Sequence, residues 1–251
     1  MQTINLSSIN MNFLESFTGS FSTIQKCEYD GQVYVYKKFD NINFFKKNMK
    51  KFQKLNEMEN DYLVMPAYFV FDDYEQVCNA YLTRFIKYKT SSVIMTLDDK
   101  VERLNTIKNN INKMHALGII HGDLHFGNIL LDENSYQNKI IDFDNCSYKN
   151  YKINKKYVAD YTNAYINKYG INKGLDIFLF NLITYSVLNN SPYFQSRLRI
   201  NNKIYGIFDT SDGRKVCDEL LLENKHFDNE YLIDTCLHLI KKQYPRNFVW
   251  I

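Results

Sequence analysis

The stretch from residue 121 to residue 144 holds the side chains best suited to chemistry. It carries two carboxylates, Asp123 and Asp142, and a carboxamide, Asn128, in polar segments on either side of an expected hairpin. A hairpin can fold its flanking segments onto one point. One carboxylate can then orient an attacking hydroxyl, while the other and the amide oxygen hold Mg²⁺, a hard cation that prefers oxygen ligands. The pattern therefore predicts phosphoryl transfer.

These residues resemble the signature of the protein-kinase-like superfamily. The segment His121-Gly-Asp-Leu-His-Phe-Gly-Asn128 is similar to its catalytic loop, and Asp142-Phe-Asp144 is similar to its D-F-G segment. The resemblance implies that Asp123 is the catalytic base and that Asn128 and Asp142 are metal ligands. It also implies that ATP and Mg²⁺ are the cofactors and that His121 braces the loop from behind.

Two other interpretations of the loop remain open. His121, Asp123 and His125 could form a metal site of another kind, or they could be ordinary polar loop residues without chemistry. Both interpretations leave the positions of Asn128 and Asp142 as a coincidence.

The N-terminal region supplies a candidate lysine for the nucleotide phosphates, either Lys37 or Lys38. The family's V-A-I-K motif places a small residue two positions before that lysine, beside the adenine. Val35 fits this role for Lys37 better than Tyr36 does for Lys38. Because side chains alternate along a strand, the two lysines point to opposite faces and one of them can face the site. We choose Lys37; the alternative is a solvated lysine on a sheet edge.

The segment from Phe17 to Ile24 is similar to the glycine-rich phosphate loop G-x-G-x-x-G-x-V. Only the middle glycine, Gly19, is retained, and Ser22 stands at the third glycine position. We expect a looser grip on phosphate than three glycines would give. The nucleotide-contacting residues expected in this segment are Gly19, Ser20, Phe21 and Ile24.

Two further nucleotide-site features follow from the resemblance. Glu57 is expected to form the ion pair with Lys37, with Glu59 as the alternative and a plain surface charge as the default for either. The hinge between lobes is expected to meet the adenine through a gatekeeper side chain and backbone groups. These hinge residues are Thr83, Phe85 and Ile86.

The surrounding periodicities indicate an α+β fold. Apolar spacing predicts helices at 42–56, 97–117, 177–188 and 231–242. Alternation predicts strands within 13–39, at 67–71 and at 77–83, and a hairpin of 129–131 with 139–141. Lysines 46, 47, 50, 51 and 54 are expected to form the solvated face of the first helix. By resemblance, the chain is one bilobal kinase-like domain, with a β-rich N-lobe at about 1–86 and a helical C-lobe at about 87–251.

The acceptor is less clearly marked than the donor site. His125 stands where protein kinases commonly carry a lysine, and we include it among the catalytic residues; H-G-D-L-H-x-G-N is closer to aminoglycoside and choline kinases. Against this, Tyr157–Tyr161 is similar to the A-P-E end of an activation segment. Asp176-Ile-Phe-Leu-Phe is similar to the start of a long buried protein-kinase helix. Arg246 is expected to pair with Asp160.

We therefore favour a Ser/Thr protein kinase. A small-molecule kinase is the alternative, and a nucleotide-binding pseudokinase or scaffold is the third possibility. Gly122 stands where many protein kinases carry an arginine, so a phosphate on the activation segment would lack that partner. We expect no switching through Thr162 or Tyr157.

Composition limits the other classes of function. The chain has 31 basic and 28 acidic residues and a net charge of +3, which gives no support for nucleic-acid binding. It shows no apolar stretch of membrane-spanning length and no secretory signal. Five scattered cysteines without a C-x-x-C pair argue against disulfides or zinc. We expect a cytoplasmic protein whose oligomeric state the sequence leaves open.

Overall fold

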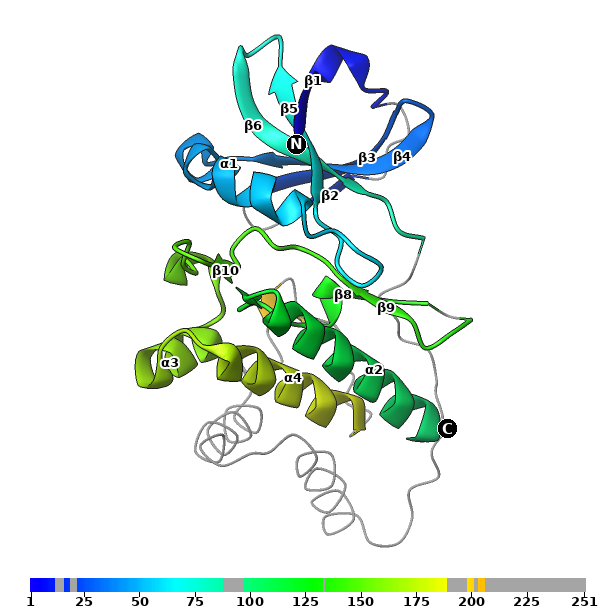
Figure 1. The fold of residues 1–251 in the computed structure, drawn as a ribbon, viewed down its shortest axis with the longest axis vertical. Helices are drawn as coiled ribbons and strands as arrows, with labels where there is room; N and C mark the ends of the chain where they lie inside the picture. The colour runs from blue at the N-terminus through cyan, green and yellow to red at the C-terminus, as the bar shows by residue number, and fades with distance from the viewer. Residues whose placement is uncertain are drawn as a thin grey trace, which may run out of the picture. The chain divides into compact units, whose positions relative to one another are not determined.

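The computed structural model describes residues 1–11, 16–18, 22–87, 97–132, 134–188, 198–200 and 203–205. The described chain has an α+β, kinase-like fold (Figure 1). It divides into two compact units. One comprises Met1–Lys87 together with Ile141–Asp144, and the other comprises Tyr88–Ile140 and Asn145–Ile251.

The first unit is built on a six-stranded sheet of order β1-β5-β6-β4-β3-β2. Neighbouring strands pair antiparallel, except that β1 runs parallel to β5. The tight β3–β4 connection is made by Asp30 and Gly31, and both residues have positive φ. The strands are β1 (Gln2–Asn5), β2 (Ser16–Thr18), β3 (Ser22–Tyr29), β4 (Gln32–Phe39), β5 (Pro66–Asp72) and β6 (Val77–Arg84).

Helix α1 (Ile42–Asn56) covers one face of this sheet. The Asn41 side chain caps it by accepting a hydrogen bond from the Phe44 N–H. Three residues of its apolar stripe, Phe45, Phe52 and Leu55, are fully buried. Phe45 packs edge-on against Phe69 of β5, with ring centroids 5.8 Å apart. These aromatic contacts fix α1 on the sheet, and the predicted helix is confirmed.

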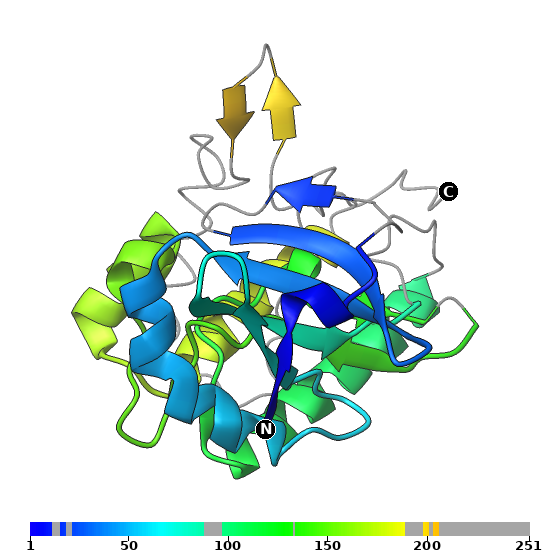
Figure 2. The same ribbon diagram turned by 90° about the horizontal axis from the view of Figure 1, so that it is seen from above.

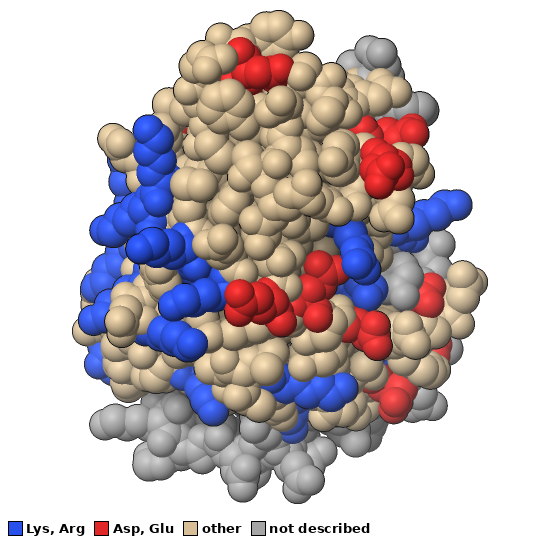
Figure 3. Space-filling model, turned by 45° about the horizontal axis from the view of Figure 1, so that its top comes forward, with Lys and Arg blue, Asp and Glu red and all other residues tan. Residues whose placement is uncertain are grey.

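The lysine face of α1 differs from expectation at one position. Lys46, Lys47, Lys50 and Lys54 are exposed, as expected. Basic side chains gather on the left of the space-filling view, the side on which α1 lies (Figure 3). Lys51, however, is only 1% exposed, so its expected place on the solvated face is wrong. It shares the buried face of the helix because it lies three residues after Asn48 and four before Leu55, and both of these residues are buried.

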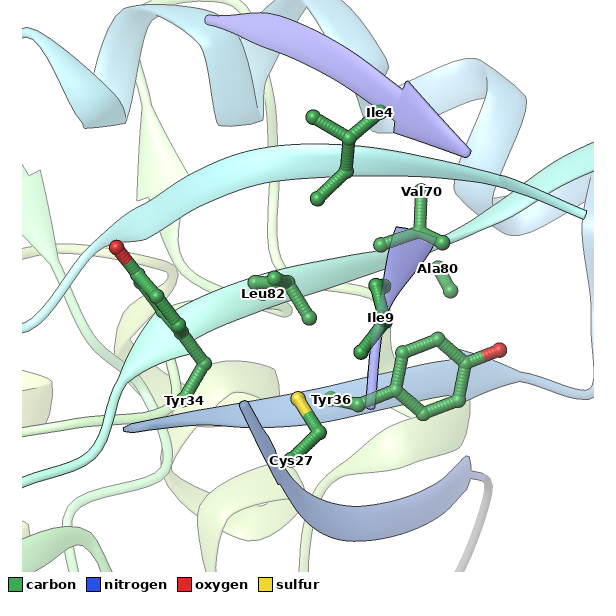
Figure 4. Packing of buried hydrophobic residues seen from close by; sticks show 8 residues of the cluster. All are labelled: Ile4, Ile9, Cys27, Tyr34, Tyr36, Val70, Ala80 and Leu82. Atoms are coloured by element: carbon green, nitrogen blue, oxygen red, sulfur yellow. The ribbon is translucent and has the colours of Figure 1, made fainter. Parts of the chain in front are cut away.

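The opposite face of the sheet is covered by an N-terminal segment that the periodicities did not predict. Strand β1 extends the sheet along β5, and Figure 2 shows it from above. The short 3₁₀ helix η1 (Leu6–Ser8) follows, and Ile9 is buried behind it. A buried cluster fills this face (Figure 4). Its members are Ile4, Ile9, Cys27, Tyr34, Tyr36, Val70, Ala80 and Leu82.

The second unit is mainly helical. Its long helices α2 and α4 pack against each other, and α3 packs on α4. Gly118, at φ +77°, follows the end of α2. The helices are α2 (Leu97–Ala116), η2 (Phe126–Asn128), η3 (Lys155–Tyr157), α3 (Asp160–Tyr169) and α4 (Lys173–Leu188).

Short strands complete this unit. The predicted hairpin is confirmed as β8 (Ile129–Leu131) antiparallel to β9 (Asn138–Ile140). Two other antiparallel pairs are present, one of β7 (Ile119–Ile120) with β10 (Ser147–Tyr148). The second is β11 (Leu198–Ile200) with β12 (Lys203–Tyr205).

Several expectations fall outside the described residues. These are the phosphate-loop residues Gly19, Ser20 and Phe21, the helix at 231–242, and Arg246. Among the described helices, none has both the length and the apolar character needed to cross a bilayer.

Candidate active site

In the first unit, the centre of the candidate site is an ion-pair cluster around Lys37 of β4. The Lys37 Nζ lies 2.8 Å from Asp142 Oδ1 and 2.5 Å from Asp144 Oδ2. Burial alone would lower the pKa of Lys37, but the charges of Asp142 and Asp144 more than offset it and raise that pKa. Lys37 is therefore a fixed cation held between two carboxylates.

Asp144 belongs to this cluster, although it was not among the predicted site residues. Burial, together with the negative charge of Asp142, raises the pKa of Asp144 to about 6 against the opposing charge of Lys37. The Tyr81 hydroxyl also donates a hydrogen bond to Asp144 Oδ1. Asp144 stands where the family's D-F-G segment has glycine, and the structure uses its side chain to tie that segment to β4 and β6.

The sheet places the predicted adenine-side residues on the same face as Lys37. Ile24 and Tyr81 lie directly opposite Lys37 on the two neighbouring strands, and Val35 lies opposite Thr83. Residues opposite each other, or two apart on one strand, share a face. The structure thus brings Ile24, Val35, Lys37 and Thr83 to one face of the sheet, the face that carries α1.

Lys38 points away from this face, as strand alternation requires. Its Nζ lies 3.2 Å from Asp72 Oδ2 and 2.8 Å from Glu75 Oε2, in the turn between β5 and β6. The structure therefore places Lys37, and not Lys38, beside Asp142.

The expected glutamate partner of Lys37 needs correction. Glu57 is exposed and caps the C-terminal end of α1. Glu59 forms an ion pair with Arg84 instead, with 3.2 Å between Glu59 Oε1 and Arg84 Nε. In this structure Lys37 pairs with Asp142 and Asp144. Glu57 follows the last residue of α1, Asn56, and at this position its side chain lies in solvent.

The predicted hinge residues lie at the end of β6, which stops at Arg84, and just after it. The Phe85 N–H donates a hydrogen bond to the Val33 carbonyl oxygen at 3.2 Å. The Lys26 ammonium stacks over the Phe85 ring, 4.5 Å from its centroid. The hydrogen bond occupies the Phe85 N–H, so the predicted backbone contact with adenine falls to Ile86.

In the second unit, the catalytic loop is held from behind by Asp176 of α4. This carboxylate is fully buried and accepts hydrogen bonds from the main-chain N–H groups of His121 (2.8 Å) and Gly122 (2.7 Å). The His115 Nε2 lies 2.9 Å from the same carboxylate. The sequence marked Asp176 as a helix start only; three donors converging on one buried acid show that it orients the loop.

Gly122 is required by the shape of this loop. Its φ is +75°, which side-chain-bearing residues rarely adopt, and a Cβ there would lie 2.2 Å from Ile153 Cδ1. An arginine at this position would meet the same obstacle. The absence of the arginine that many protein kinases carry here thus has a local steric reason.

The remaining loop residues surround Asp123. His121 is buried, and its Nδ1 accepts a hydrogen bond from the Asp123 N–H at 3.2 Å, which agrees with a bracing role. The Asn128 Nδ2 donates to the Asp123 carbonyl oxygen at 2.9 Å. That bond engages the Asn128 amide nitrogen, so the predicted metal-ligand role falls to the amide oxygen.

His125 lies beside the predicted base. Its Nδ1 accepts a hydrogen bond from the Gly127 N–H at 3.0 Å, so the ring proton of the neutral imidazole is on Nε2. That nitrogen lies 4.0 Å from Asp123 Oδ2. His125 thus presents an N–H toward the Asp123 carboxylate.

Activation-segment features are only partly described. Thr162, in α3, is fully buried. Asp160 begins α3, and its expected partner Arg246 lies outside the described residues, so their ion pair stays a prediction. A threonine without solvent exposure agrees with the expectation that Thr162 is not a phosphorylation switch.

The donor chemistry of the first unit fits a divalent cation. Asp142 and Asp144 both direct a carboxylate oxygen at one ammonium group, so the pair already converges on positive charge. Carboxylate oxygens are ligands that Mg²⁺ prefers. Within the described ranges, no three His, Cys, Asp or Glu side chains group as a metal cluster, so the alternative histidine site gains no support.

Three residues of the site escaped the sequence analysis. Tyr81 and Lys51 contact Asp144 from elements 63 and 93 residues away in the chain, and no local spacing marks such pairs. Asp144 itself did carry a signal, because an acid replaces the glycine of the D-F-G segment.

A strand lysine paired with a carboxylate just after a hairpin, and an H-G-D loop anchored on a buried helix aspartate, are the features expected of a protein-kinase-like domain. A family model for the protein kinase domain matches residues 18–245, and the chain belongs to this family. Membership implies ATP as the phosphoryl donor and usually a divalent metal.

The chain is also similar to a curated relative named probable choline kinase 3 from Arabidopsis thaliana. The two are 30% identical over 81 residues, which cover 26% of this chain and 23% of the relative. The chain thus matches about a quarter of that relative's length.

Proposed function

We propose that this protein is an ATP- and Mg²⁺-dependent kinase that transfers the γ-phosphoryl group to a Ser or Thr hydroxyl of a protein. The observation that carries the proposal is the Lys37 cluster, in which one lysine and two carboxylates converge on a single point. A fixed cation beside acidic metal ligands is what phosphate binding and charge neutralisation require.

The residues divide the work as follows. Lys37 binds phosphate oxygens, while Asp142 and the Asn128 amide oxygen hold the metal. Bound Mg²⁺ would neutralise charge on the phosphates. Asp123 orients the acceptor hydroxyl and accepts its proton, and His121 keeps the Asp123 backbone in place.

The adenine lies, in this proposal, on the sheet face that carries Lys37. Ile24, Val35 and Thr83 would contact the ring, because the register places them on that face. The Ile86 backbone would meet the ring edge, and the loop of Gly19, Ser20 and Phe21 would cover the phosphates.

A small-molecule acceptor is the second candidate. The similarity to a probable choline kinase favours it, as does His125 at the position where protein kinases commonly carry lysine. The match of the protein kinase domain model over most of the chain favours the protein acceptor. We therefore keep the protein acceptor first.

The test is transfer from γ-labelled ATP in Mg²⁺ by wild type and by Asp123→Ala. Acceptors are the protein itself, generic proteins, choline and an aminoglycoside. We expect label on protein, reduced about 10²- to 10⁴-fold in Asp123→Ala, with ATP affinity retained. Asp40→Ala, which removes an exposed carboxylate outside the site, is the control and should transfer normally.

The outcomes separate the candidates. Label confined to choline or the aminoglycoside establishes the second function. ATP binding without any transfer indicates a pseudokinase. Full transfer by Asp123→Ala contradicts the assignment of Asp123 as the base.

A further inference from the structure

Lys51 is the one buried lysine of an otherwise solvated lysine face. Its neighbours Lys47 and Lys50 are exposed, whereas Lys51 is 1% exposed. Removing an ammonium group from water is costly unless strong partners replace the water. The partners of the Lys51 ammonium must therefore offset the cost of burying it.

Lys51 contacts the backbone of the predicted metal-binding segment. The Lys51 Nζ donates a hydrogen bond to the Asp144 carbonyl oxygen at 2.5 Å. The same ammonium lies 5.4 Å from the centroid of the Phe52 ring, a favourable cation–π position. A charged donor on a main-chain acceptor is stronger than a neutral hydrogen bond, and burial strengthens it further.

Asp144 is consequently held from three elements at once. Lys51 of α1 binds its carbonyl oxygen, while Lys37 of β4 and Tyr81 of β6 bind its side chain. The preceding Phe143 is 2% exposed. These contacts explain why four residues, 141–144, group with the first unit although their chain neighbours belong to the second.

The segment held by these contacts also contains a residue in an unfavourable backbone conformation. Asp142 has φ +65°, a left-handed conformation that a residue with a Cβ adopts only at an energetic cost. Such a conformation persists where surrounding contacts over-determine it. The Lys51 bond lies two residues further on and restrains the same short segment.

We propose that Lys51 is a positioning residue that holds the Asp142–Asp144 backbone so that the Asp142 carboxylate is presented to the metal. This proposal rests on the proposed function. In this proposal α1 contributes a lysine that binds the backbone of residues 141–144. The expectation had been a glutamate, Glu57, paired with Lys37. Lys51 touches neither substrate nor reacting atoms in this role.

The test compares Lys51→Met, which keeps the length and apolar stem, with Lys51→Arg, which keeps the charge. Lys50→Met is the matched control on the exposed side of α1. The first measurement is hydrogen exchange of a peptide covering residues 141–144, without nucleotide. The second is the Mg²⁺ concentration that gives half-maximal stimulation of binding of a fluorescent ATP analogue, beside its affinity in EDTA.

We expect Lys51→Met to lose exchange protection in this peptide and to raise the Mg²⁺ midpoint about tenfold, the size found for residues that orient metal ligands. Its nucleotide affinity in EDTA should stay within twofold of wild type. Lys51→Arg should recover most of the Mg²⁺ effect, and Lys50→Met should match wild type in both measurements.

Two results would overturn the proposal. One is an unchanged Mg²⁺ midpoint in Lys51→Met, even with a lower melting temperature, because that describes a purely structural lysine. The other is equal effects of Lys51→Met and Lys50→Met. Failure of the proposed function is distinguishable, since wild type itself would then show no Mg²⁺-stimulated nucleotide binding, and this would overturn both proposals together.

Discussion

The two segments that carry the predicted chemistry are held in place by different means. The metal segment, 141–144, is gripped by side-chain charges and a hydroxyl from strands and a helix remote in sequence. The catalytic loop, 121–128, is held through its main chain, which donates to the buried carboxylate of Asp176. The placement of residues 141–144 therefore depends mainly on charged and polar side chains. The placement of residues 121–128 depends on main-chain hydrogen bonds.

The difference predicts how each segment responds to change. A main chain bound to one acid is sensitive to that acid and to the conformation of the bonded residues. A segment gripped by several side chains loses only part of its support when one of them is removed. We therefore expect the largest effects at Asp176 and Gly122 and smaller ones around Asp144.

The largest expected effect is that of Asp176→Asn. The two loop N–H groups bind separate carboxylate oxygens, and an amide has only one oxygen, so one N–H would face an NH₂ group. We expect a loss of about 3–5 kcal/mol, measured by urea unfolding, and slower phosphoryl transfer. A variant as stable as wild type would show that the loop is held by something other than Asp176.

Gly122→Ala comes next. The added Cβ meets the Ile153 side chain and the residue must keep φ +75°, so we expect about 2–4 kcal/mol of destabilisation. Gly31→Ala is the control, because Gly31 has φ +69° but open space around a Cβ, and it should cost only about 1 kcal/mol.

A second variant separates the two causes at Gly122. Adding Ile153→Val should recover the steric part of the loss and none of the backbone part. Equal unfolding free energies for Gly122→Ala and Gly31→Ala would contradict the steric argument.

Tyr81→Phe tests the shared grip on the metal segment. It removes one donor to Asp144 and leaves Lys37 and Lys51 in place, so we expect about 1–2 kcal/mol of destabilisation and a modest rise in the KM for ATP. Unfolding and steady-state kinetics measure these effects. A loss as large as that of Asp176→Asn would refute the idea that the grip is distributed.

The smallest effect is expected at Asp72, which combines both kinds of contact. Its carboxylate accepts from the main-chain N–H groups of Glu75 and Tyr74 and from Lys38. The Glu75 N–H, aided by Lys38 and the Tyr74 N–H, outweighs the opposing effect of burial and lowers the pKa of Asp72 below its ordinary value of 3.8.

A lowered pKa gives the folded state a stabilisation that is present above pH 3.8 and is lost as pH falls through the lowered value. Asp72→Asn should therefore reduce the melting temperature by a few degrees at pH 7. The gap to wild type should narrow in acid. A gap that is constant from pH 7 to pH 3 would exclude the carboxylate charge as its cause.

Much of the site was predictable because its signals are local. The spacing of Asp123, Asn128 and Asp142, and the hairpin between them, follow from short segments of chain. The choice of Lys37 over Lys38 needed only strand alternation and the small residue Val35. Their chemical roles stay predictions until variants are measured.

The errors share a physical cause, which is that they concern contacts between remote elements. Glu57 has a reasonable separation from Lys37, yet the end of α1 leaves it in solvent. Lys51 lies among solvated lysines in the sequence, and only the packing of α1 on the sheet shows that it is buried. Strand β1 carries too few residues for a periodic signal and is fixed by pairing with β5.

The sequence by itself determined the class of this protein, because the residues of a catalytic loop and a metal segment must recur at nearly fixed separations along the chain. Only the tertiary structure decided which side chains hold those segments. Asp144, Tyr81 and Lys51 meet through sheet register and helix packing, and a charge can find its partner from any element that the fold brings near. The spacing of motif residues can be recognised in short segments of sequence, whereas the pairing of charged side chains depends on the tertiary structure.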